Sequence, residues 1–79
     1  MANRSVRRNE LIREMERLYS DRAYSDSELA ERLTVNRSTV YRTRVFMEEE
    51  LNLPFRVEVP GHYRLDRQKQ LGSIRLTQL

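Results

Sequence analysis

Residues 25–51 read Ser25-Asp-Ser-Glu-Leu-Ala-Glu-Arg-Leu-Thr-Val-Asn-Arg-Ser-Thr-Val-Tyr-Arg-Thr-Arg-Val-Phe-Met-Glu-Glu-Glu-Leu51, and the rest of the chain is arranged around this stretch. Ser25 and Glu28 have the spacing of a capping box, in which each side chain bonds the other residue's backbone N–H at a helix start. Tyr24 is placed to pack on Leu29 as a hydrophobic staple. The stretch therefore begins with a short helix, whose buried face is predicted to hold Leu29, Ala30 and Leu33.

A second helix is expected after a short break in this pattern. Asn36 is a favoured N-cap residue, and behind it Val40, Met47 and Leu51 continue an apolar stripe at helical spacing. Two helices joined by a tight turn resemble the DNA-binding helix-turn-helix. In that motif the second helix, here residues 36–51, enters the major groove by its N-terminal end.

The face of the second helix opposite the apolar stripe carries side chains suited to DNA. Arg bonds guanine bidentately, Ser and Thr donate and accept, and both Arg and Tyr reach phosphates. No acid occurs from Asn36 to Arg44, whereas Glu48, Glu49 and Glu50 lie at the other end, which should point away from DNA. The alternative is a polar face that contacts only water. The side chains on this face are Arg37, Ser38, Thr39, Tyr41 and Arg42.

The N-terminal segment predicts a further helix from about Ser5. Arg4, Arg7 and Arg8 stand there without an acid. They form either a solvated terminus or an arm along a phosphate backbone, and Arg7 is our candidate for such a contact. An amphipathic stripe follows, made of Leu11, Ile12, Met15, Leu18 and Tyr19.

After Leu51 the pattern changes from helical to extended. Pro54 ends the helix, because it disfavours helical geometry in the residue before it. Alternating apolar and polar residues then flank a Pro60-Gly61 turn, which predicts a hairpin, or wing. Its inward residues should be Phe55, Val57, Val59, Tyr63 and Leu65. Its outer face should offer Arg56, His62 and Arg64 to phosphates or the minor groove.

Composition limits the possible functions. Seventy-nine residues allow one domain, and the net charge is +3, with fourteen of fifteen basic residues being Arg. The sequence holds no Cys, no Gly-rich phosphate loop and no catalytic set, and its single His has no second metal ligand at suitable spacing. We therefore expect a cytoplasmic protein that is not an enzyme, with no cofactor, metal or small-molecule substrate and no membrane association. Double-stranded DNA is the expected partner.

Residues from about Ser5 to Leu65 resemble the N-terminal winged-helix domain of DeoR-type and WYL-domain bacterial transcriptional regulators. The resemblance lies in Glu28-Leu-Ala-Glu-Arg-Leu33, Val35, Arg37, Thr39-Val-Tyr-Arg42, Leu53-Pro-Phe55 and Gly61-His-Tyr-Arg-Leu65. It implies that the bases are read by Arg37, Ser38, Thr39 and Arg42. It also implies that Tyr41 contacts a phosphate.

Three positions depart from the pattern of these regulators. Thr34 replaces the usual turn Gly, which is tolerable if the backbone avoids positive φ there. Thr43 and Arg44 replace the usual Asp-Ile, and Arg44 is expected to add a phosphate contact. The full set of predicted backbone contacts is Asn36, Tyr41, Arg44, Arg56, His62, Arg64 and Arg7.

The sequence thus predicts a mainly α fold with a small β-hairpin, namely a winged helix-turn-helix of three helices and a two-stranded wing. Residues 1–66 would form the DNA-binding domain, and residues 67–79 a tail, linker or dimerisation segment. The expected function is sequence-specific binding of double-stranded DNA as a homodimer on paired half-sites. One alternative is a winged helix that binds proteins through an apolar patch around Phe46 and Val45. The other is a regulatory DNA-binding domain cut from a larger protein.

Overall fold

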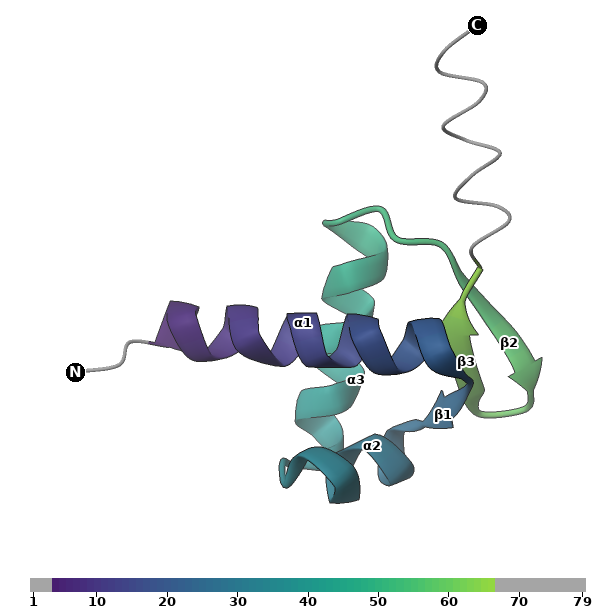
Figure 1. Ribbon diagram of the computed structural model, residues 1–79, viewed down its shortest axis with the longest axis horizontal. Helices are drawn as coiled ribbons and strands as arrows, with labels where there is room; N and C mark the ends of the chain where they lie inside the picture. The colour runs from purple at the N-terminus through teal and green to yellow at the C-terminus, as the bar shows by residue number, and fades with distance from the viewer. Residues whose placement is uncertain (1–3, 67–79) are drawn as a thin grey trace, which may run out of the picture.

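The computed structural model of the protein describes residues 4–66 and is mainly helical (Figure 1). Its helices are α1 (Arg4–Asp21), α2 (Asp26–Leu33) and α3 (Arg37–Glu49). Its strands are β1 (Tyr24–Ser25), β2 (Phe55–Val59) and β3 (His62–Leu65). The strands form one antiparallel sheet in the order β1-β3-β2. The predicted residues 67–79 tail lies outside the described residues.

The sheet has three strands where the sequence predicted a two-stranded hairpin. The additional strand, β1, pairs Tyr24 with Tyr63 and Ser25 with His62. Two residues are too few to show the alternation of a strand, so this segment reads as the end of a turn in the sequence. The pairing ties the start of α2 directly to the hairpin.

A single apolar core lies between the three helices and the inner face of the sheet. α1 crosses α3, and the C-terminal end of α1 meets β3 (Figure 1). The predicted α1 stripe is confirmed, with Leu11 at its partly buried margin, and Tyr24 and Leu29 join the same core. Leu51 is 44% exposed, since α3 ends at Glu49 before the stripe reaches it. The core residues are Ile12, Met15, Leu18, Tyr19, Tyr24, Leu29, Val40, Met47 and Leu65.

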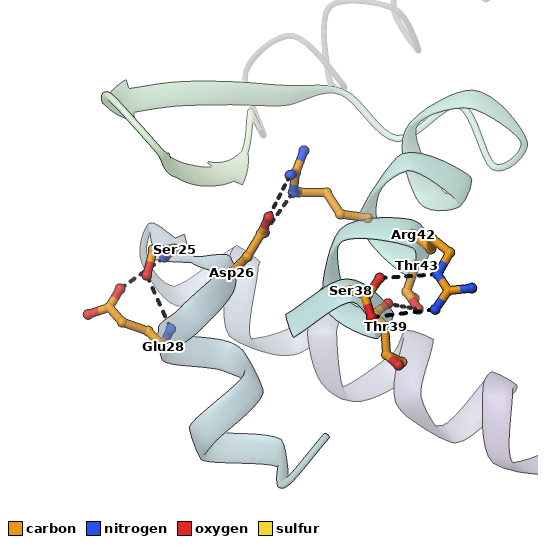
Figure 2. Close-up of polar contacts among 8 residues, drawn as sticks. Ser25, Asp26, Glu28, Ser38, Thr39, Arg42 and Thr43 are labelled. Carbon is orange, nitrogen blue, oxygen red and sulfur yellow. Dashed lines mark hydrogen bonds and ion pairs between the residues drawn. The ribbon is translucent and has the colours of Figure 1, made fainter. Parts of the chain in front are cut away.

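The predicted capping box opens α2 (Figure 2). Ser25 Oγ accepts from the Glu28 backbone N–H at 3.1 Å, and Glu28 Oε1 accepts from the Ser25 N–H at 2.9 Å. The latter bond lowers the pKa of Glu28 below its ordinary value. Two of the free N–H groups at the helix start are thereby satisfied.

The turn between α2 and α3 departs from our expectation. Thr34 has φ 56°, in the left-handed region that favours Gly. The Val35 N–H donates to the Ala30 carbonyl at 3.0 Å, which closes the helix end in the manner of a Schellman motif. Asn36 occupies the N-cap of α3, but its side chain makes no capping hydrogen bond. The closed turn sets the direction of α3 relative to α2.

The outer part of the hairpin is more exposed than predicted. Phe55 and Leu65 pair and pack on the core, but Val57 is 58% and Val59 51% exposed. The β2–β3 register shifts between Val57 and Val59, which marks a bulge and breaks the alternation on which the prediction rested. β3 packs against α1, whereas β2 is the far edge strand. Across residues 4–66, no helix has the length and apolar character needed to cross a membrane.

Candidate nucleic-acid interface

The N-terminal half of α3 presents a polar, basic surface, which we call the leading face of α3. Val40 and Met47 are fully buried and fix the opposite side of the helix in the core. Four of the predicted contact residues are exposed, and Thr39 is half-buried at the margin. The exposed residues are Arg37, Ser38, Tyr41 and Arg42. The structure therefore brings together on one face the side chains that the sequence placed there.

Arg42 lies along this face and touches Ser38 (Figure 2). Its Nε and Nη2 donate to the Ser38 carbonyl and Oγ, both at 3.4 Å. These bonds are long and solvent-exposed, so little free energy opposes an exchange of partner. Within the described residues, no ion pair holds Arg37 or Arg42. Both guanidinium groups are thus available to an anionic or hydrogen-bonding ligand.

A groove separates the leading face of α3 from the N-terminal part of α1. Its volume is about 590 Å³, and none of its lining residues is Asp or Glu. The predicted backbone contact Arg7 lines it together with Arg42, so two distant parts of the chain converge there. Arg8, which the sequence did not single out as a contact, lines it too. Leu11 and Val35 supply apolar surface.

Arg44 does not belong to this surface, and its predicted phosphate contact is wrong. Only 6% of the residue is exposed. Its Nη2 and Nε donate to the two carboxylate oxygens of Asp26 at 3.0 and 3.2 Å, and its guanidinium lies 3.7 Å from the centre of the Tyr63 ring. Burial disfavours the charged form of Arg44, but the bonds to Asp26 outweigh it and raise the pKa. Arg44 instead joins α3 to α2 and the sheet.

Tyr19 lies in the core close to this pair. Its hydroxyl is buried, and no other described residue is within hydrogen-bonding geometry. Burial raises the pKa of Tyr19 well above its ordinary value, although the positive charge of Arg44 opposes the shift. The phenol therefore stays neutral, and Tyr19 serves as an aromatic core residue, with edge contacts to Tyr24 and Phe55.

Arg56 and Arg64, which the sequence placed on the outer face of the hairpin, share one carboxylate. Glu58 accepts from Arg56 at 3.3 Å and from Arg64 at 3.2 Å. These bonds, led by the one from Arg64, lower the pKa of Glu58. His62 is half-buried, with Nδ1 3.2 Å from the Pro60 carbonyl and Nε2 3.6 Å from Glu28. The hairpin therefore offers less free positive charge than its arginines alone indicate.

Phe46 and Val45 do not form an exposed apolar patch. Both are half-buried, and Phe46 packs against the core. The guanidinium of Arg8 lies 3.9 Å from the centre of the Phe46 ring, a cation–π contact that links α1 to α3. Nor does any cluster of three potential metal ligands occur between residues 4 and 66.

Comparison with known proteins does not assign a function. No protein-family model matches the chain, and neither a curated protein nor a solved structure matches it significantly. A function must therefore be inferred from the leading face of α3, the adjoining groove and the hairpin.

Proposed function

We propose that the protein binds double-stranded DNA sequence-specifically and acts as a transcription regulator with a winged helix-turn-helix fold. The observation that carries this proposal is the leading face of α3, where exposed arginine, hydroxyl and phenol groups occur without a carboxylate partner from residues 4–66. A helix end of this composition suits the major groove, which displays hydrogen-bonding groups on every base pair. α2, the closed turn and α3 would be the helix-turn-helix, and β2–β3 the wing.

The positions of the side chains suggest separate roles. Arg37, Ser38 and Arg42 would contact base edges, with Thr39 at the margin of the same surface. Asn36, whose side chain is exposed and free of the capping bond, would contact the phosphate backbone together with Tyr41 and Arg7. These contacts position the protein, and the base contacts supply the sequence preference.

The charge along α3 supports an orientation in the groove. Glu48, Glu49 and Glu50 are exposed at the C-terminal end, where phosphates would repel them. The basic leading end would therefore enter the groove and the acidic end would point outwards. Arg56 and Arg64 would add weaker backbone contacts, because each would first have to share or leave Glu58.

This proposal places the protein in the cytoplasm, without catalytic activity, and as a homodimer on paired half-sites, as helix-turn-helix proteins commonly are. Much of the affinity would come from phosphate neutralisation and would fall as salt is added. A protein-binding module is less well supported, since Phe46 is half-buried beneath Arg8.

Selection from a random duplex pool at near-physiological salt, followed by sequencing, tests the proposal. We expect enrichment of a pair of short half-sites, whose spacing would report the separation of the two α3 helices. Enrichment of one half-site would support DNA reading but contradict the dimer. A folded protein that enriches no sequence would contradict the proposal.

A further inference from the structure

The groove between α1 and α3 has properties that a phosphate-binding surface alone does not require. Phosphates are bound by exposed, polar, positively charged surface. Here the arginines surround apolar surface from Leu11 on α1 and Val35 in the turn before α3. A volume of about 590 Å³ falls in the range of pockets that hold small organic molecules. The groove therefore combines positively charged side chains with apolar surface.

The charge of the groove restricts the class of ligand. Arg7, Arg8 and Arg42 line it, and no carboxylate of the described part of the chain does. None of the three is in an ion pair within residues 4–66. Arg8 is held in place by its contact with the Phe46 ring, 3.9 Å from the ring centre, so less conformational entropy is lost when it binds an anion. A neutral or cationic ligand would leave three like charges facing one another.

We propose that this groove binds a small amphipathic anion, with an apolar body on Leu11 and Val35 and a carboxylate or similar anionic head among Arg7, Arg8 and Arg42. Arginine is suited to the head because its planar guanidinium bonds a carboxylate through two parallel N–H groups. The half-buried Thr39 borders the groove. The occupant is a single dissolved molecule, since the volume of the groove, about 590 Å³, matches one small ligand.

The location of the groove gives the ligand a regulatory effect, and this part of the inference rests on the proposed function. Arg42, Thr39 and Arg7 belong both to the groove and to the surface proposed to contact DNA. An anion bound there neutralises Arg42 and places negative charge where a phosphate would lie. Ligand and DNA therefore compete for the same residues, so added ligand lowers the apparent affinity for DNA by a factor that grows with the ligand concentration.

Titration of the full chain with decanoate in the absence of DNA tests the site independently of DNA binding. Two-dimensional NMR would follow the backbone amides, and retained signal dispersion would show that the fold is intact. We expect saturable shifts centred on Leu11, Val35 and Thr39. Acetate, which carries only the head, and decan-1-ol, which carries only the tail, should each bind at least tenfold more weakly.

Variants distinguish the groove from general attraction to a basic protein. Arg8→Ala and Arg42→Ala should each weaken decanoate binding about two- to fivefold, the upper part of the range measured for one exposed charge pair. Arg13→Ala is the matched control for Arg8→Ala, because Arg13 is exposed on α1, as Arg8 is, but does not line the groove. It should leave the affinity unchanged.

Several results would overturn the inference. These are an absence of saturable shifts at the groove, equal binding of acetate or decan-1-ol, an equal effect of Arg13→Ala, and binding to vesicles of anionic phospholipid without binding to dissolved decanoate.

A subsequent DNA titration tests the regulatory part. Decanoate at ten times its dissociation constant should weaken DNA binding about tenfold. Undiminished DNA binding would overturn the competition, whereas a protein that binds decanoate but no DNA would contradict only the proposed function.

Discussion

The leading face of α3 and the β2–β3 hairpin both carry two arginines, but they offer different amounts of positive charge. Arg37 and Arg42 on α3 have no carboxylate partner among the described residues, whereas Arg56 and Arg64 both bond Glu58. On the hairpin the bulge sets Glu58 between them, and the shared contact lowers its pKa. The number of arginines in a segment therefore does not measure how much positive charge the segment can offer to a phosphate. What counts is whether a carboxylate already binds them.

Arg44 is a third kind of arginine, buried inside the molecule. It lies two residues after Arg42 on the same helix, yet it is 6% exposed and bonded to Asp26. Its role is to hold α3 against α2, which keeps the leading face in position. The arginines thus occupy three environments. Arg37 and Arg42 have no carboxylate partner among the described residues, Arg56 and Arg64 share Glu58, and Arg44 is buried against Asp26. Each environment predicts a different response to mutation.

The largest expected effect is on the buried pair. Asp26→Ala should lower the free energy of unfolding by about 3 kcal/mol, because it leaves the charge of Arg44 buried and unpaired. Urea denaturation followed by circular dichroism measures the change. The exposed Arg42→Ala serves as the control and should change stability by no more than about 0.5 kcal/mol. Equal losses for the two variants would remove the distinction between the inner and leading faces of α3.

A smaller effect is expected at the turn that directs α3. Thr34 adopts φ 56°, a conformation that costs an L-residue with a Cβ about 1 kcal/mol or more. Thr34→Gly should therefore raise the free energy of unfolding by about 1 kcal/mol, as measured in urea. Thr34→Ala keeps the Cβ, so it should raise the free energy of unfolding by less than Thr34→Gly does. Destabilisation by Thr34→Gly would show that the threonine side chain stabilises the turn by more than the backbone conformation costs.

The smallest effect is expected on the DNA affinity that the hairpin arginines contribute. Glu58→Gln removes the carboxylate shared by Arg56 and Arg64, so it should tighten binding to any duplex by roughly two- to fivefold at low salt. Fluorescence anisotropy with a random-sequence duplex measures this. Glu10→Gln, on the exposed surface of α1, is a control for the change in net charge. An equal gain from both variants would mean that Glu58 does not specifically restrain the hairpin arginines.

The features that could be predicted from sequence depend on local periodicity. The α1 stripe and the Ser25–Glu28 capping box involve residues within a few positions of one another, and both are present. The exposed leading face followed from the apolar stripe behind it. Solvent exposure of Arg37 and Arg42 could therefore be anticipated before the structure.

The features that could not be predicted depend on distant contacts or on backbone irregularities. Asp26 and Arg44 are 18 residues apart, and an arginine directed inwards looks in sequence like one directed outwards. β1 is two residues long and exists only because β3 lies beside it. The bulge near Glu58 shifts the register, and Val57 and Val59 are exposed on the edge strand β2. The groove exists only where α1 and α3 meet, so the sequence could group Arg8 with the N-terminal arginines but could not place it beside Arg42.

The most direct test of the central claim compares Arg42→Ala with Arg64→Ala on the selected duplex and on a random one. Arg42→Ala should reduce the ratio of the two affinities, by the equivalent of about 1–3 kcal/mol of binding free energy, because it removes a base contact. Arg64→Ala should weaken both duplexes modestly and leave the ratio unchanged. An unchanged ratio for Arg42→Ala in a folded protein would contradict base reading by the leading face of α3.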